Sequence, residues 1–226
     1  MAYIKKGIIL FSVFILMISL FSAGSVFAQS NGDGEEKNTS KKSTISIKAG
    51  RLQNEKDLIF FSDGLEIKKD DITLKSPEGE FDDNENKIIL KDGVEMLYSE
   101  GTINSDKMTG YFDDDEFIFE NKVKMKYKSE EDENKNFDLE SKKLQINSES
   151  QSFTANENVV INYDKKVIKA NKAKYDSEKE LLVVTNDVHI KKENGDWVKS
   201  DRAEFDLSTG EQNFSAEGNV EIEITL

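Results

Sequence analysis

Residues 182–192, LVVTNDVHIKK, contain the pattern that decides the fold. The apolar side chains of this segment stand at even spacing, at Leu182, Val184, Val188 and Ile190. Even spacing places side chains on one face of a β-strand, so the segment is predicted to be a strand with one apolar face. The polar residue Asn186 interrupts the apolar row. This interruption predicts a kink or bulge at which one long strand turns a corner between two sheets.

The same pattern occurs six times along the chain. Aligned on the apolar residue two positions after the interruption, the copies are centred on Leu65, Val94, Val123, Val159, Val188 and Val220, with spacings of 29, 29, 36, 29 and 32 residues. Such self-similarity is typical of repeat proteins. The single longer spacing is explained by an insertion within residues 128–136, KSEEDENKN, which is expected to be a surface loop.

A second strand is predicted before each of these segments, and a turn rich in Asp, Asn, Ser and Gly is expected to connect the two strands. Each repeat is therefore a two-strand unit, and six units give about twelve strands. The predicted fold class is all-β, built as two stacked antiparallel sheets that hide the apolar rows between them. An array of this kind has an open edge strand at each end, near Ile45–Lys48 and near Glu221–Leu226, and these edges are expected to join copies of the chain or partners of the same fold.

Residues 1–28 are expected to lie outside this domain. Lys5 and Lys6 precede an apolar run from Gly7 to Phe21, and the Ser25–Ala28 segment has small residues suited to cleavage. The segment is predicted to be a secretory signal peptide, with a retained inner-membrane anchor as the alternative because the apolar stretch is about 20 residues long. Residues 29–43 carry no large apolar side chain and are predicted to be a solvated linker. The folded domain is then residues 44–226, exported to the cell envelope.

Composition excludes several functions. The 226-residue chain has 31 Lys and Arg against 45 Asp and Glu, a net charge of −14, and no basic cluster that would bind nucleic acid. It has no cysteine and a single histidine, His189, which is expected to face outward. The acidic runs 113–116 and 130–133 lack the spacing of a calcium loop and are predicted to be solvated turns. No cofactor, no metal site and no enzymatic activity are expected.

Two longer segments carry a resemblance to a known family. Residues 45–82 and 167–192, the latter reading VIKANKAKYDSEKELLVVTNDVHIKK, resemble the repeat of the periplasmic lipopolysaccharide-transport A family, also called the organic-solvent-tolerance A-like family. The resemblance covers about residues 45–226. It implies an open, twisted β-jellyroll that carries lipopolysaccharide on an apolar interior between inner- and outer-membrane transport proteins of the same fold. The chain departs from the family in having Ser76, Ser105, Ser141 and Ser200 where the family often has alanine.

The apolar rows are the candidate lipid-binding site, because acyl chains need a continuous apolar groove and flexible Met with wide aromatics can line one. The candidate residues are Phe61, Leu65, Leu90, Val94, Met96, Phe117, Phe119, Val123, Met125, Phe153, Val159, Ile161, Val184, Val188, Ile190, Phe214, Val220 and Ile222. Two alternatives stay open. A retained residue 1–28 segment would favour a membrane-anchored scaffold like the periplasmic domain of the family's transport protein C, and a fully packed interior would favour a solid-core surface protein.

Overall fold

The computed structural model describes residues 45–69, 72–98, 101–128, 136–208 and 214–225, and every element within them is a β-strand. The all-β prediction is confirmed. The strands are β1 (Ile45–Glu55), β2 (Leu58–Lys69), β3 (Ile72–Ser76), β4 (Glu78–Asp82), β5 (Lys87–Lys91), β6 (Val94–Tyr98), β7 (Gly101–Ser105), β8 (Lys107–Tyr111), β9 (Glu116–Tyr127), β10 (Phe137–Asn147), β11 (Ser152–Tyr163), β12 (Lys166–Asp176), β13 (Leu181–Lys192), β14 (Trp197–Asp206), β15 (Phe214–Glu217) and β16 (Glu221–Glu223).

Parts of the sequence prediction lie outside the described residues. The expected signal peptide (1–28), the expected linker (29–43), the acidic run 130–133 and most of the 128–136 insertion belong to this group. Within the described ranges, no helix has the length and apolar character needed to cross a membrane.

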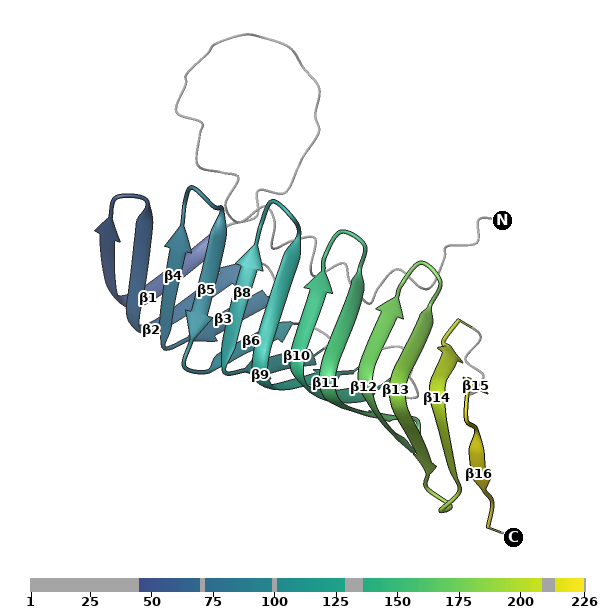
Figure 1. Ribbon diagram of the computed structural model, residues 1–226. Coiled ribbons are helices and arrows are strands. Elements are labelled where there is room, and N and C mark those ends of the chain that lie inside the picture. The colour runs from purple at the N-terminus through teal and green to yellow at the C-terminus, as the bar shows by residue number, and fades with distance from the viewer. Residues whose placement is uncertain (1–44, 70–71, 99–100, 129–135, 209–213, 226) are drawn as a thin grey trace, which may run out of the picture.

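The strands form one hydrogen-bonded sheet of sixteen strands (Figure 1) and not two separate stacked sheets, which corrects the prediction. Each long strand runs from one layer into the other, so the same backbone contributes to both. Four of the expected strands are broken at the corner and give the pairs β3 and β4, β5 and β6, β7 and β8, and β15 and β16. Twelve expected strands therefore become sixteen.

The breaks also produce a ring of strand pairings. In β2, residues 58–61 pair with β4 while residues 65–69 pair with β3, and β9 likewise pairs with β8 and with β7 through its two halves. Together with β5 and β6, these six strands close a ring of eight in which each strand is hydrogen-bonded to the next. From β9 onward the strands pair one after another as unbroken, bent ribbons as far as β14.

Two consecutive residues with positive φ produce the corner in each repeat. Asn186 and Asp187 have φ of 67° and 62°, and the pairings of β13 with β12 and with β14 both shift register at this point. The equivalent residues of the other repeats share this conformation, namely Asp63 and Gly64, Asp92 and Gly93, Asn121 and Lys122, Glu157 and Asn158, and Gly218 and Asn219. Asn, Asp and Gly tolerate this region best, which explains the composition of the interruption. The predicted kink or bulge is confirmed within β2, β9, β11 and β13, whereas at Asp92–Gly93 and Gly218–Asn219 the strand ends at the corner.

Buried serines stabilise the corner. They lie on the intervening strands, which are the first strand of each two-strand repeat. The single hydroxyl hydrogen of Ser76 is shared between the carbonyl oxygens of Glu78 (2.7 Å from Oγ) and Lys91 (2.8 Å). Ser105, Ser141 and Ser200 each donate to the carbonyl oxygen two residues ahead, at 2.9, 3.1 and 2.9 Å. A buried carbonyl without a donor costs about 1–3 kcal/mol. The serines that depart from the family's alanine therefore satisfy backbone groups that the bend releases from the sheet.

The corner geometry predicts how Asn186 responds to substitution. We expect Asn186→Val to lower the free energy of unfolding by about 1–2 kcal/mol, because a β-branched side chain is strained at positive φ. Asn186→Gly should leave it unchanged or raise it slightly, because glycine adopts this conformation without strain. Urea denaturation of both variants measures the difference, and equal stability of the two would contradict the assigned conformation.

Candidate site on the inner face of the folded sheet

The structure brings most of the predicted site residues together between the two layers. Fifteen of the eighteen are buried in one apolar cluster: Phe61, Leu65, Leu90, Val94, Met96, Phe117, Phe119, Val123, Met125, Phe153, Val159, Ile161, Val184, Val188 and Ile190. Phe214 is partly buried against this cluster. Val220 and Ile222 are instead 45% and 61% exposed. These two lie on the last described segment, where β16 pairs with β14 and no further described strand covers it.

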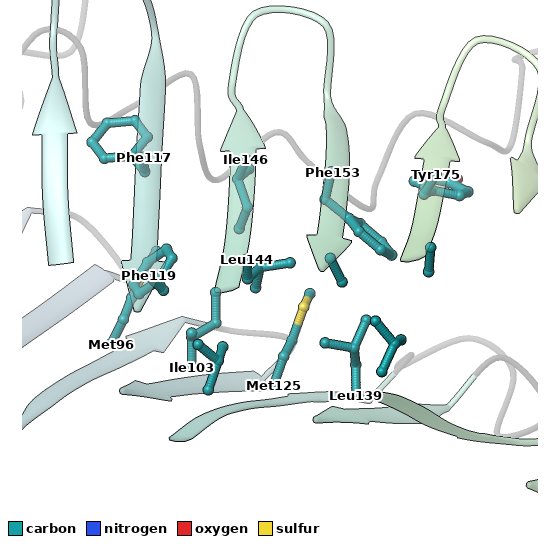
Figure 2. Packing of buried hydrophobic residues seen from close by; sticks show 14 of the residues in the cluster. Met96, Ile103, Phe117, Phe119, Met125, Leu139, Leu144, Ile146, Phe153 and Tyr175 are labelled. Atoms are coloured by element: carbon teal, nitrogen blue, oxygen red, sulfur yellow. The ribbon is translucent and has the colours of Figure 1, made fainter. Parts of the chain in front are cut away.

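Side chains from both layers meet in the middle of this cluster. Figure 2 shows Phe117, Ile146 and Phe153 of the upper layer opposite Met125 and Leu139 of the lower layer. Phe117, Phe119, Met96 and Leu139 have no exposed surface. In this conformation the inner face is therefore a closed, packed core at its centre.

Several members of the cluster were not among the predicted site residues, because they lie on the preceding strand of each repeat. Ile103, Met108, Leu139, Leu144 and Ile146 are fully buried beside the predicted residues. The apolar positions of the preceding strand in each repeat were the signal that could have placed them in the site. Gly110 stands on β8 where the other repeats have a large apolar residue, such as Phe81 or Ile146. Packing explains the glycine, because a Cβ atom there would lie 3.1 Å from the ring of Phe117.

A row of four aromatic rings joins the free rims of the two layers. Tyr127 and Phe137 are register partners on β9 and β10 in the lower layer, with ring centroids 5.4 Å apart. Phe153 and Tyr175 are register partners on β11 and β12 in the upper layer, 5.5 Å apart. Phe137 and Phe153 stack across the gap at 6.5 Å. We call these four residues the aromatic closure. It closes the rim opposite the corner by side-chain contact between the layers.

The aromatic closure places Tyr175 in an apolar setting. Burial raises the pKa of the Tyr175 hydroxyl to about 12, and the nearby carboxylate of Glu180 acts in the same direction. Burial disfavours the charged phenolate, so this hydroxyl keeps its proton at any physiological pH.

The outer surface is polar, and its described ion pairs are exposed. Lys124 and Glu140 lie 3.1 Å apart across β9 and β10, and Lys142 lies 3.0 Å from Glu157. His189 is on this outer side, as predicted, with its ring edge-on to Trp197 at 5.9 Å. Within the described residues no group of three or more His, Asp or Glu is arranged to hold a metal ion.

A cleft of about 590 Å³ lies at the corner of the first strands. Its lining includes Gly50, Gly64, Pro77 and Gly93, together with outward side chains such as Glu66. Glu66 pairs in register with Lys48 and Lys75 and alternates with buried Leu65 and Ile67. The cleft lies at the corner itself, and Leu65 is the one predicted site residue among those that line it.

The inner apolar rows extend to both ends of the sheet, where they become exposed. On β1, Ile47 and Leu52 are register partners of buried Ile67 and Phe61. At the other end, Ile222 is the register partner of buried Val198. Within the described residues β1 pairs with β2 alone, and β15 and β16 pair with β14 alone. Each end therefore presents a strand edge beside an exposed strip of the inner face.

Comparison with known proteins identifies the class. The chain matches the LptA/(LptD N-terminal domain) LPS transport protein family over residues 73–211, which is more than half of its length. The chain belongs to this family, and the resemblance inferred from the repeats is confirmed. The matched family is described as one of lipopolysaccharide transport proteins.

A solved structure resembles the chain at low sequence identity. The chain is similar to LptH of Pseudomonas aeruginosa, described as the LptA homologous periplasmic component of the conserved lipopolysaccharide transport device. The identity is 11%, the TM-score is 0.48, and the match covers 69% of this chain and 95% of that chain. No curated protein matches the sequence.

The burial of Tyr175 predicts how stability responds to alkaline pH. Between pH 10 and about 12 the folded protein keeps a proton that the unfolded chain has released, so the free energy of unfolding falls as pH rises through this window. Tyr175→Phe should show a smaller fall than wild type. Urea denaturation at stepped pH values measures both slopes. Identical slopes would contradict burial of this hydroxyl.

Proposed function

We propose that this chain is a periplasmic carrier that takes lipopolysaccharide from the inner toward the outer membrane along its inner apolar face. Membership of the lipopolysaccharide transport family supports the class of cargo. The observation that carries the proposal is the unbroken inner row, which runs from β1 to β16 and is exposed at both ends. Acyl chains would lie along this row, and the sugar headgroup would stay at the rim.

Cargo uptake requires the layers to part, because the centre of the cluster is packed. The aromatic closure is the contact that has to yield. The two layers of the sheet meet there through the rings of Phe137 and Phe153. An aromatic pair contributes only about 0.5–1.5 kcal/mol to stability beyond the effect of its buried area. The corner would act as the fixed side of the opening, since its backbone is continuous between the layers. With the layers parted, the folded sheet would be the open jellyroll that the family resemblance implies.

Two other functions compete with this proposal. A solid-core surface protein is favoured by the side chains of zero exposure at the centre. A membrane-anchored scaffold of the same fold would follow if residues 1–28 were retained as an anchor. Both alternatives predict that the inner row does not contact lipid during transport.

Photocrosslinking in envelope membranes tests the cargo. A photoreactive amino acid at Phe119, Ile161 or Ile190 should label lipopolysaccharide, because these side chains face the interior. The same probe at Lys124 or His189 should not, because these residues face outward. Labelling confined to the inward positions supports a carrier. Lack of labelling at all five positions in a folded protein would contradict the proposal and favour the solid-core alternative.

The end strands are proposed to join partners of the same fold or further copies of this chain, head to tail. An exposed edge offers unpaired backbone groups, and the exposed apolar strip beside it would be covered on joining. The partners in this arrangement would be inner-membrane and outer-membrane transport proteins with the same jellyroll.

Sedimentation tests this joining. The average mass of the wild-type chain should rise with concentration or on mixing with a partner domain, and Ile222→Lys should weaken that rise, because Ile222 is exposed at the apolar edge. Glu221→Lys on the same strand is the matched control and should behave as wild type. A constant monomer mass under both conditions would contradict edge joining.

A further inference from the structure

Lys166 is a charged residue in an apolar row. On β12 the side chains of Lys166, Ile168 and Ala170 alternate with exposed ones, so all three face inward. Taken as a whole residue, Lys166 is only 8% exposed, and among the described residues no other charged residue is as deeply buried. Removing an ammonium group from water is costly, so a lysine at such a position needs a strong partner.

The partner in this structure is the carboxylate of Asp164 in the preceding turn. The two side chains form an ion pair and are only 9% and 8% exposed. The Nζ atom of Lys166 also donates to the backbone carbonyl oxygen of Asp164 at 3.3 Å. Asp164 and Lys165 both have positive φ and form the tight turn between β11 and β12. The turn therefore holds an anionic oxygen against an inward cation at the rim of the lower layer.

A second cation lies beside the first. Lys192 is the register partner of Lys166 on β13, and it follows buried Ile190 by two residues, so it ends the same inner row. Like charges directly opposite each other on neighbouring strands are destabilising. The carboxylate of Asp196 accepts hydrogen bonds from the amide of Thr225 (2.9 Å) and from Asn194 (2.8 Å), and its pKa is lowered by these bonds and also by the charge of Lys192. Two lysines are therefore held side by side on the inner side of the rim, each near one carboxylate.

The two lysines continue the rim of the aromatic closure. In register order across β10, β11, β12 and β13, the inner rim residues are Phe137, Tyr163, Lys166 and Lys192. Two aromatic side chains are followed by two cations. An amphiphile at this rim would place apolar chains against the inner rows, its ring-shaped sugars near the aromatic side chains, and an anionic group at the lysines.

We propose that Lys166 and Lys192 bind a phosphate group on the headgroup of the glycolipid whose acyl chains the inner rows take. This inference rests on the proposed function and adds the headgroup chemistry to it. A phosphate monoester carries about −1.5 to −2 charges and three acceptor oxygens, against one charge on a carboxylate. The phosphate replaces the Asp164 carboxylate as partner of Lys166 and bridges to Lys192. The ion pair with Asp164 keeps the buried cation compensated while no cargo is bound.

The experiment compares a phosphorylated glycolipid with its dephosphorylated form on the full chain. Wild type should bind the phosphorylated form about tenfold more tightly, as expected for a desolvated contact to a charged group. The double variant Lys166→Met and Lys192→Met should lose this preference. Methionine keeps the length of the side chain without its charge. The matched control is Lys169→Met with Lys191→Met, on the same two strands but facing outward and exposed, and it should keep the wild-type preference.

A second variant keeps the test valid if an unpaired Asp164 prevents folding. Asp164→Asn combined with Lys166→Met removes both buried charges, and it should also lose the preference. Equal binding of the two lipids by wild type would overturn this inference and leave the proposed function intact. Binding of neither lipid would overturn the proposed function itself. Inorganic phosphate serves as a competitor. If it binds as tightly as the phosphorylated lipid, the lysines form a site for free anions, and the headgroup assignment is overturned.

Discussion

The pair of left-handed residues at the corner of each repeat is the constraint on which the architecture depends. In β2, β9, β11 and β13 it turns a long strand through the corner without ending it, so a single sheet supplies both layers and faces its own apolar side. The buried serines on the intervening strands hold the same corner by satisfying carbonyl groups that the bend releases. Because every repeat bends at the same place, the inner rows align from one end of the sheet to the other. A continuous apolar face is thus a consequence of local backbone chemistry.

The two sides of the folded sheet differ in how they are joined. At the corner the layers share a backbone, whereas at the opposite rim they meet through the side chains of the aromatic closure. Side-chain contacts can separate without unfolding any strand, so the same molecule can be a packed core when empty and a groove when loaded. This asymmetry reconciles the fully buried centre with a transport family. It also places the inward lysines where a headgroup would remain when acyl chains enter.

Much of this arrangement could be predicted from the sequence, because period-two spacing and the polar interruption are local signals. They predicted the strands, the bulge before Val123 or Val188, and an inward set that includes Phe119 and Ile161. The sequence did not predict the closed ring of eight strands, since it depends on which strands pair and the local pattern does not specify this. The sequence also did not predict the aromatic closure, because Phe137 and Phe153 come into contact only when the bend at the corner brings the two layers together. Lys166 was missed because a lysine beside a turn resembles an ordinary solvated residue.

The central claim is that the layers part at the aromatic closure when cargo binds. The chain has no cysteine, so single cysteines can be introduced for spin labels. Labels at Asp138 and Lys174 lie on the outer surfaces of the lower and upper layers near the closure, and a pair at Lys174 and Ser215 lies within the upper layer alone. Electron paramagnetic resonance distances should lengthen for the first pair when lipopolysaccharide is added, and stay constant for the second. An unchanged distance for the first pair with lipopolysaccharide bound would contradict the account.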